Sequence, residues 1–178
     1  IFHHTKTRGK GKTYFDTADP TPNKSRIPEL VRSVLQGNYI DILSVNENEA
    51  VCYASQLGQE IKDAELKLDE LTKESARVLA AHLSTRVDLH TTSFSATFTK
   101  KSETVVPTIK VPVLRTTGAG DAWNAGNILG DAYGLSNGCR LTLANAVAAY
   151  YISSPNGTHP KREQLAKFCE KIERRKVT

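Results

Sequence analysis

Residues 116–126 read TTGAGDAWNAG, and this stretch decides the fold. Its glycine and alanine residues allow a tight turn and a close approach of the backbone to a ligand. A helical pattern begins at the turn, and the N-terminus of a helix offers unpaired N–H groups and a positive dipole end that together bind phosphate. Asp121 lies in the first helical turn, where its carboxylate can accept a proton from a hydroxyl group. The alternative is that Asp121 only caps the helix.

Strand-like and helix-like segments alternate along the rest of the chain. Short apolar and β-branched runs predict strands at 13–16 and 39–45. Strand-like stretches separated by short polar turns follow at 86–90, 94–99 and 104–106. Apolar residues at helical spacing predict helices at 27–36, 47–57, 72–83 and 138–152, and another from the glycine turn to about 132. A last helix is predicted with Pro160 in its first turn. Gly37 and Gly58 are expected to end the first two helices. This alternation predicts a three-layer α/β fold.

Length and composition indicate one domain over residues 1–178, with 39% hydrophobic and 24% charged residues, as in ordinary globular proteins. The net charge of +5 is modest and its basic residues are scattered, so no nucleic-acid partner is expected. The three cysteines stand far apart and form no CxxC spacing, which argues against disulfides and zinc and favours the cytoplasm. No apolar run approaches ~18 residues, so we expect no contact with a membrane.

Three stretches together resemble one enzyme family. RTTGAGDAWNAG (115–126) is similar to the second signature of the ribokinase-like, phosphofructokinase B type carbohydrate kinases, which commonly reads D-T-T-G-A-G-D-x-F-x-x-G. DILSVNENEA (41–50) resembles the strand that delivers the N-x-x-E motif of that family, and LANAVAAYYISSPNG (143–157) resembles its adenine-side helix and the loop that follows. The chain is thereby identified as a member of this family. The resemblance implies a three-layer α/β/α ribokinase-like fold with a mostly parallel central sheet.

The resemblance also implies a role for the glycine turn. Asp121 matches the catalytic base that deprotonates the sugar hydroxyl. The backbone of Gly118, Ala119, Gly120 and Asp121 matches the anion hole for the phosphoryl group that ATP donates. Trp123 stands where the family has phenylalanine.

Further site residues follow from the same resemblance. Asn46 and Glu49 match the pair that holds Mg²⁺ through water near the nucleotide phosphates, which suits an ion that keeps much of its hydration shell. Asn145 matches a position beside the nucleotide base, and its alternative role is that of a polar residue satisfied within a buried helix. Asp16 and Asp19 lie at the end of a predicted strand and face the same region, where we expect them to cap turns.

Some positions depart from the family pattern. Arg115 replaces an aspartate associated with a monovalent-cation loop, and a guanidinium cannot bind potassium, so we expect its fixed charge to substitute for the ion. DLHTTSFSATF (88–98) stands where many members have a strand followed by G-x-x-G, so the resemblance specifies the chemistry more closely than the phosphate donor. His90 in this stretch is interpreted as structural.

The largest departure concerns the family's N-terminal half, with its first glycine-rich signature, most sugar contacts and lid. No stretch corresponds to it, the chain starts IFHHTK, and methionine is absent throughout. We therefore expect this chain to be part of a longer protein or a chain with segments missing.

The leading interpretation is a carbohydrate kinase that transfers the γ-phosphoryl group of ATP to a hydroxyl of a sugar or sugar-like substrate. A nucleoside kinase of the same family is the first alternative. A non-catalytic relative that binds nucleotide or sugar and regulates another process is the second. The expected partners are small molecules, and a homodimer stays open.

Overall fold

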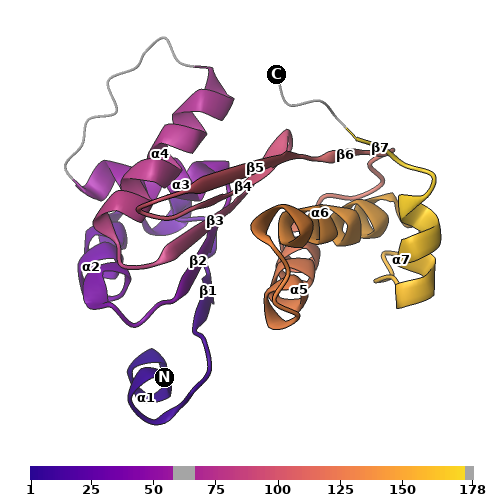
Figure 1. The fold of residues 1–178 in the computed structure, drawn as a ribbon. Helices are drawn as coiled ribbons and strands as arrows, with labels where there is room; N and C mark the ends of the chain where they lie inside the picture. Colours follow the sequence, from indigo (N-terminus) through magenta and orange to yellow (C-terminus); the bar gives the residue numbers. More distant parts are fainter. Residues whose placement is uncertain (58–66, 175–178) are drawn as a thin grey trace. The chain divides into compact units, whose positions relative to one another are not determined.

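The computed structural model describes residues 1–57 and 67–174, which form two compact units (Figure 1). The first unit comprises residues 1–89 and 97–103, and the second comprises residues 90–96 and 104–178. The chain passes between the two units at three points, which are after residue 89, within strand β4 (Phe94–Phe98) and after residue 103. That residues 1–178 act as a single domain stays a prediction.

The strands of the first unit pair in parallel. They are β1 (Tyr14–Asp16), β2 (Ile42–Val45) and β3 (Arg86–His90), the last residue of β3 belonging to the second unit. Tyr14 pairs with Ile42, and Val45 pairs with Leu89. All of β2 is buried, as expected for a parallel strand that is covered on both faces. The strand order of the larger sheet is β1-β2-β3-β4-β5, where β5 is Glu103–Pro107.

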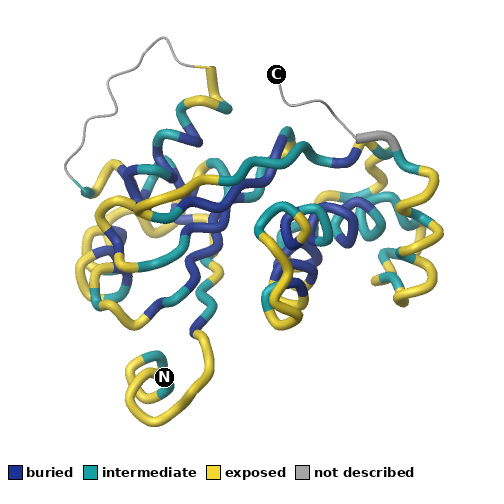
Figure 2. Tube along the Cα trace, in the orientation of Figure 1, coloured by how far each residue is buried: buried dark blue, intermediate teal, exposed yellow. Residues whose placement is uncertain are grey.

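The first unit also contains helices. They are α1 (Phe2–Arg8), α2 (Ile27–Ser33), α3 (Glu47–Ala54) and α4 (Leu68–His82), with short 3₁₀ segments at Thr21–Arg26, Leu35–Gly37 and Ser55–Leu57. Helices α3 and α4 pack against each other. The dark blue trace of Figure 2 marks the buried core, to which β2, β3 and α4 contribute Leu43, Val45, Val87, Leu89 and Leu79.

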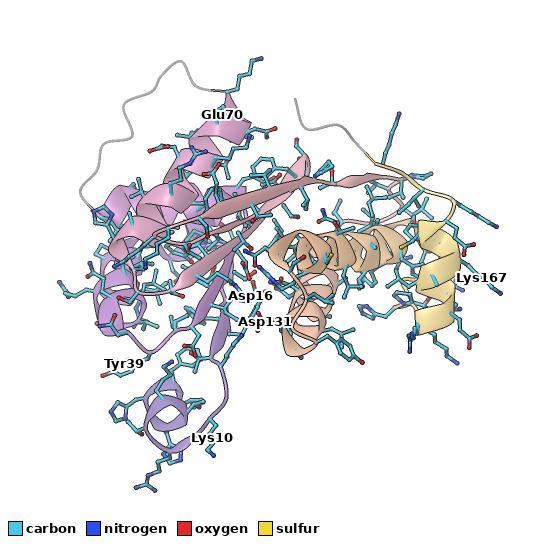
Figure 3. All side chains as sticks on the ribbon, in the orientation of Figure 1. Lys10, Asp16, Tyr39, Glu70, Asp131 and Lys167 are labelled. Carbon is cyan, nitrogen blue, oxygen red and sulfur yellow. The ribbon has the colours of Figure 1, made fainter. Side chains whose placement is uncertain are left out.

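Helix packing dominates the second unit. Helix α5 (Ala119–Ala132) packs along α6 (Asn137–Ser153), and the two approach closely because a Cβ atom at Gly126 would lie 2.8 Å from the Cα atom of Ala144. Helix α7 (Arg162–Cys169) adds Leu165 and Phe168 to the core, while its Lys167 is exposed (Figure 3). Strands β6 (Ile109–Lys110) and β7 (Glu173–Arg174) pair in antiparallel fashion.

The structure confirms the predicted alternation and corrects several boundaries. Helix α2 ends before the predicted stop at Gly37, which lies in a 3₁₀ turn, and the chain turns instead at Asn38 with φ 58°. Pro160 is not in the first turn of α7, because the helix begins after Lys161. Helix α4 starts at Leu68, earlier than expected, and Gly58 lies outside the described residues.

Three elements were not predicted, namely α1, β6 and β7. The residues of α1 carry no buried apolar face, so the helical period left no signal in the sequence. Across the described parts of the chain, no helix combines the length and apolar character needed to cross a bilayer.

Candidate functional site

The glycine turn precedes α5 in a conformation that requires glycine. Gly118 is the N-cap residue and has φ 83° and ψ 2°, in the left-handed region that other residues rarely adopt. The hydroxyl of Tyr151 lies so close that a Cβ atom at position 118 would be 2.6 Å from it. Backbone conformation and packing therefore both specify glycine here.

The amide groups of the turn divide into engaged and free donors. The N–H of Ala119 donates to the carbonyl of Thr116 (3.1 Å), and the N–H of Ala122 donates to the carbonyl of Gly118 (3.0 Å). Within residues 1–57 and 67–174, the N–H groups of Gly120 and Asp121 have no acceptor. The Ala119 N–H, expected to be part of the anion hole, is therefore already hydrogen-bonded. The N–H groups of the next two residues remain as donors for an anion.

Asp121 lies beside these free donors. Its side chain is exposed, it occupies the first turn of α5, and no side chain caps this helix. Among the described residues nothing bonds to the Asp121 carboxylate. The geometry does not support the alternative that Asp121 is the cap, because Gly118 takes the N-cap position.

Asn145 lies in a buried polar network of the second unit. Its Oδ1 accepts hydrogen bonds from Ser95 Oγ (2.5 Å) and Trp123 Nε1 (3.0 Å), and its Nδ2 donates to the carbonyl of Pro107 (2.9 Å). Asn145 and Trp123 are 4% and 3% exposed. This geometry favours the alternative role, that of a polar residue satisfied within a buried helix. It also accounts for tryptophan in place of phenylalanine, since a buried indole N–H needs an acceptor.

Asn46 and Glu49 form a capping box at the start of α3. Asn46 Oδ1 accepts from the Glu49 N–H, Glu49 Oε2 accepts from the Asn46 N–H, and Asn46 Nδ2 donates to Glu49 Oε1, each at 3.0 Å. Sequence reasoning missed this role, although an N-cap residue followed three positions later by glutamate is its usual signature. The pair is therefore brought together by the structure of the helix terminus itself.

Burial alters the acidity of Glu49. The residue is 3% exposed, and this burial raises the pKa of its carboxyl above the ordinary value, opposed by the hydrogen bond from the Asn46 N–H. The negative charges of Asp16 and Asp19 raise the pKa further. Such a carboxylate gains from a nearby cation. In the described part of the chain no three acidic, histidine or cysteine side chains are arranged to hold a metal, so an ion here would take most ligands from water or phosphate.

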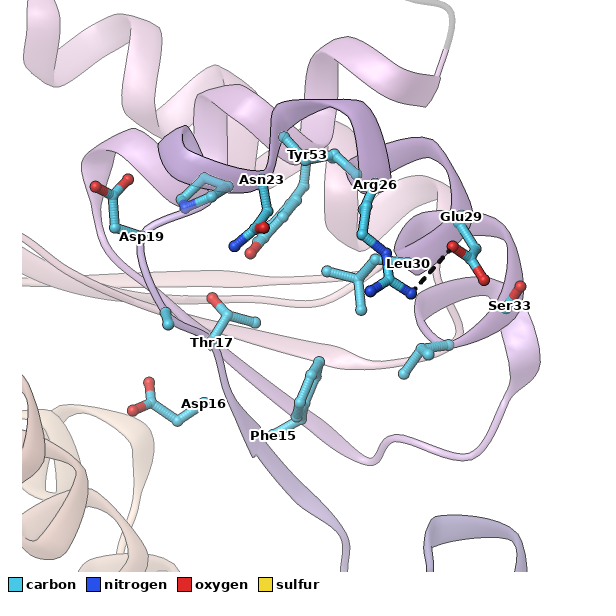
Figure 4. Close-up of a pocket in the computed structure, with 14 residues that line it drawn as sticks. Phe15, Asp16, Thr17, Asp19, Asn23, Arg26, Glu29, Leu30, Ser33 and Tyr53 are labelled. Atoms are coloured by element: carbon cyan, nitrogen blue, oxygen red, sulfur yellow. Dashed lines mark ion pairs between the residues drawn. The ribbon is translucent and has the colours of Figure 1, made fainter.

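A cavity of about 470 Å³ lies beside these acidic residues (Figure 4). Asp16 and Asp19 line it together with Thr17 and the buried Tyr53. Asp19 caps a turn as predicted, because its Oδ1 accepts from the Thr21 N–H (3.0 Å), and the hydrogen bonds from Thr21 lower the pKa of Asp19. The role of Asp16 stays a prediction.

Arg115 contacts the loop that follows α6. Its Nη2 donates to the carbonyl of Pro155 (2.5 Å), and its Cζ lies 6.0 Å from the centre of the Tyr151 ring. Its Nε is buried and finds no acceptor within the residues that the structure describes. A fixed positive charge thus faces a carbonyl of this loop, and its substitution for a monovalent cation stays a prediction.

The unusual stretch after β3 makes a compact turn. Thr91 Oγ1 accepts hydrogen bonds from the N–H groups of Ser93 (3.1 Å) and Phe94 (2.9 Å), which closes the connection into β4. The His90 ring lies 5.0 Å from that of Trp123, and a Cβ atom at Gly120 would be 3.4 Å from His90. His90 thus packs behind the glycine turn, in keeping with the structural role expected for it.

The candidate residues fall into two groups. The glycine turn, Asp121 and Asn145 belong to the second unit, and Asn46 and Glu49 belong to the first. Within the second unit, Asn145 bonds to Trp123, which follows Asp121 by two residues in α5.

Comparison with known structures identifies the fold. Ribokinase from Cryptococcus neoformans in complex with ADP has 17% sequence identity and a TM-score of 0.70, over 95% of this chain and 55% of that chain. Aminoimidazole riboside kinase from Salmonella enterica has 21% identity and a TM-score of 0.68, over 96% and 55% of the two chains. A nucleoside kinase from Methanocaldococcus jannaschii has 19% identity and a TM-score of 0.70, over 96% and 52%. This chain therefore has the ribokinase-like α/β fold and spans about half the length of these proteins.

Sequence comparison identifies the family. No curated protein sequence gives a significant match. A family model described as prokaryotic ketohexokinase matches residues 33–172, which is most of the chain and includes both α3 and the glycine turn. Together with the fold, this match confirms the resemblance seen in the motifs. The chain belongs to the prokaryotic ketohexokinase family, within the ribokinase-like carbohydrate kinases of the phosphofructokinase B type.

Proposed function

We propose that this protein is an ATP-dependent sugar kinase in which Asp121 is the general base and the glycine turn is the anion hole. The observation that carries the proposal is the open N-terminus of α5. An exposed carboxylate without a partner in the described chain lies next to two free amide donors, Gly120 and Asp121, at the positive end of a helix. These are the groups that phosphoryl transfer to a hydroxyl requires.

The proposed reaction is a single displacement at phosphorus. The hydroxyl oxygen of the sugar attacks the γ-phosphorus of ATP, and the bond from that phosphorus to the bridging oxygen breaks, which releases ADP. The Asp121 carboxylate takes the hydroxyl proton as the new oxygen–phosphorus bond forms. The free amides of the turn donate hydrogen bonds to the transferring group, whose negative charge is spread over its outer oxygens.

Asn46 and Glu49 would hold Mg²⁺ through water, and the ion would supply positive charge at the nucleotide phosphates. Glu49 fits this role because its carboxylate is buried near two other acidic residues, an arrangement that a cation would stabilise. ATP as the donor is supported by the ribokinase of similar fold that was solved with ADP.

A ketohexose is the first acceptor to test, because the matching family model carries that name. A nucleoside is the second, because a nucleoside kinase shares the fold. The test is a screen of the full-length protein with ATP and Mg²⁺ against ketohexoses, aldohexoses, sugar acids and nucleosides, with ADP release measured and the product identified by phosphorus NMR. ATP without an acceptor is the control for hydrolysis.

We expect ADP release that depends on a ketohexose and yields a phosphate monoester. Phosphorylation of nucleosides alone would replace the sugar by the alternative acceptor. Tight binding of nucleotide or sugar without any product would favour the regulatory, non-catalytic alternative.

A further inference from the structure

Tyr151, on the last turn of α6, lies between two basic side chains. The guanidinium carbon of Arg115 is 6.0 Å from the centre of its ring, and the imidazole of His159 stacks on the ring at 4.9 Å with an interplanar angle of 22°. Contacts of this kind hold an aromatic ring in one orientation. The ring therefore joins the segment before the glycine turn to the segment that follows α6.

The hydroxyl of Tyr151 reaches the glycine turn itself. It donates a hydrogen bond to the carbonyl of Thr117 at 3.3 Å, which is long for a hydroxyl donor. The same oxygen lies where a side chain at Gly118 would be, since a Cβ atom there would be 2.6 Å away. The hydroxyl thus contacts both sides of the peptide bond that enters the turn.

A second glycine shows that Arg115 is packed just as tightly. Gly157 has φ 61°, and a Cβ atom there would lie 2.0 Å from Arg115 Nη1. Arg115 is also held by its hydrogen bond to the carbonyl of Pro155. By contrast, Gly134 also has a positive φ (66°), but no atom lies within 4 Å of its Cβ position. Two left-handed glycines of the second unit therefore face the Arg115–Tyr151 pair, and each leaves room for it.

Glycine at position 118 creates a need for such a support. A glycine peptide can rotate between several backbone conformations at little cost, so a turn built on it does not hold its amides in place unaided. Fixing the Thr117 carbonyl fixes the plane of the peptide bond between Thr117 and Gly118. That plane determines how the chain enters α5, and hence where the free amides of Gly120 and Asp121 point.

We propose that Tyr151 is a positioning residue for the anion-binding turn, held by Arg115 and His159 and acting on the peptide between Thr117 and Gly118. The inference rests on the proposed function for its effect on catalysis. Its effect on the turn is independent of any activity. Tyr151 does not contact the transferring phosphate in this account, and it acts through the backbone alone.

The test compares Tyr151→Phe with Tyr150→Phe in the full-length protein. Tyr150 precedes Tyr151 in the same helix, and its ring packs edge-on against Phe168 at 5.5 Å, away from the turn. Both variants lose one hydroxyl and keep the ring, so Tyr150→Phe is a matched control. Melting temperature, kcat, nucleotide KM and hydrogen exchange of a peptide covering residues 116–122 are measured for each.

Tyr151→Phe should lower kcat by about fivefold, as expected for the loss of one hydrogen bond, with nucleotide KM and melting temperature nearly unchanged. Exchange in the 116–122 peptide should become faster, because a peptide between Thr117 and Gly118 that is free to rotate weakens the neighbouring turn bond from the Ala119 N–H to the Thr116 carbonyl. Tyr150→Phe should change none of these quantities. A second variant, Tyr151→Leu, removes the stacking with His159 as well and should enlarge both effects.

Unchanged exchange in residues 116–122 for both Tyr151 variants would overturn the inference, whatever the kinetics show. A fall in kcat that is equal in Tyr150→Phe and Tyr151→Phe would also overturn it, since a general loss of packing would then be the cause. If the unmodified protein phosphorylates no acceptor, the proposed function fails, and the exchange data still decide the role of Tyr151.

Discussion

Two helices of this chain begin at candidate site residues, and they differ at their N-termini, since one has a side-chain cap and the other has none. At α3, Asn46 and Glu49 bond to each other's backbone and close the helix end with a capping box. At α5, glycine occupies the N-cap, no side chain caps the helix, and two amides stay free beside Asp121.

A capped helix N-terminus contributes to stability, whereas an uncapped one can bind a ligand. A capped terminus has satisfied part of its donors, here the N–H groups of Asn46 and Glu49, and the cap stabilises the folded chain. An open terminus leaves donors that an anion can satisfy, and the folded chain forgoes the stability of a cap. We therefore propose that the start of α5 binds the phosphoryl group. The start of α3 has a structural role, to which we propose to add water-mediated binding of Mg²⁺.

A large effect is expected from placing a side chain at the open terminus. Gly118→Ala places a Cβ atom 2.6 Å from the Tyr151 hydroxyl at a φ of 83°. Backbone strain of this kind costs about 1–3 kcal/mol of stability. Loss of the turn geometry should lower kcat by about 10²-fold or more, as when an oxyanion-hole donor is lost.

Gly134→Ala is the matched control for that experiment. It has φ 66° and no neighbour within 4 Å of the Cβ position, so it carries the backbone strain without the clash. Both variants are compared by melting curve and steady-state kinetics. Equal falls in kcat in the two variants would show that strain, and not the turn, limits the rate.

A smaller effect is expected at the closed terminus. Glu49→Gln keeps an oxygen that can accept from the Asn46 N–H and so preserves the main capping bond, but it removes the negative charge. The Mg²⁺ concentration needed for half-maximal rate should rise by about tenfold or more, as for other outer-shell partners of a metal. Titration of Mg²⁺ against rate measures this.

Glu49→Ala completes the comparison, since it removes the charge and the bonds that the Glu49 side chain accepts from Asn46, and should cost a further ~1 kcal/mol of stability. If Glu49→Gln leaves the Mg²⁺ curve unchanged while Glu49→Ala lowers only the melting temperature, Glu49 is a capping residue and nothing more.

The smallest expected effect is on the pH dependence of stability. Burial raises the pKa of Glu49, so the folded state binds its proton more tightly than the unfolded chain does. Its contribution to stability is therefore full below the unfolded pKa and is lost as the pH rises through the folded pKa. Relative to Glu49→Gln, the unmodified protein should lose melting temperature as the pH rises from about 4 to 7. A difference between the two proteins that stays constant over this range would contradict the account.

The sequence predicted the elements of the sheet and the turn better than it predicted the ends of helices. Strand β3 has the predicted bounds, because RVDLH alternates polar and apolar residues between short polar turns. The start of α7 was wrong because Pro160 was read as a first-turn proline. In the structure the Gln164 side chain accepts a hydrogen bond from the Lys161 N–H (2.8 Å), so Lys161 is the N-cap residue and the helix begins at Arg162.

The candidate site shows the same division. The glycine turn could be predicted because its residues are contiguous and glycine is required by one backbone conformation. The capping box of Asn46 and Glu49 could also have been read from their spacing. The bonds among Ser95, Trp123 and Asn145 could not, because they join three segments that are distant in sequence and depend on how these pack.

The central claim is that Asp121 serves chemistry at an open helix terminus and does not serve the helix. The direct measurement is kcat of the full-length Asp121→Asn variant beside its melting curve. Asparagine keeps the size and hydrogen-bonding capacity of the side chain but cannot act as the base. We predict a fall in kcat of about 10²–10⁴-fold, with the melting temperature and nucleotide KM nearly unchanged. A variant that keeps most of its kcat would contradict the account.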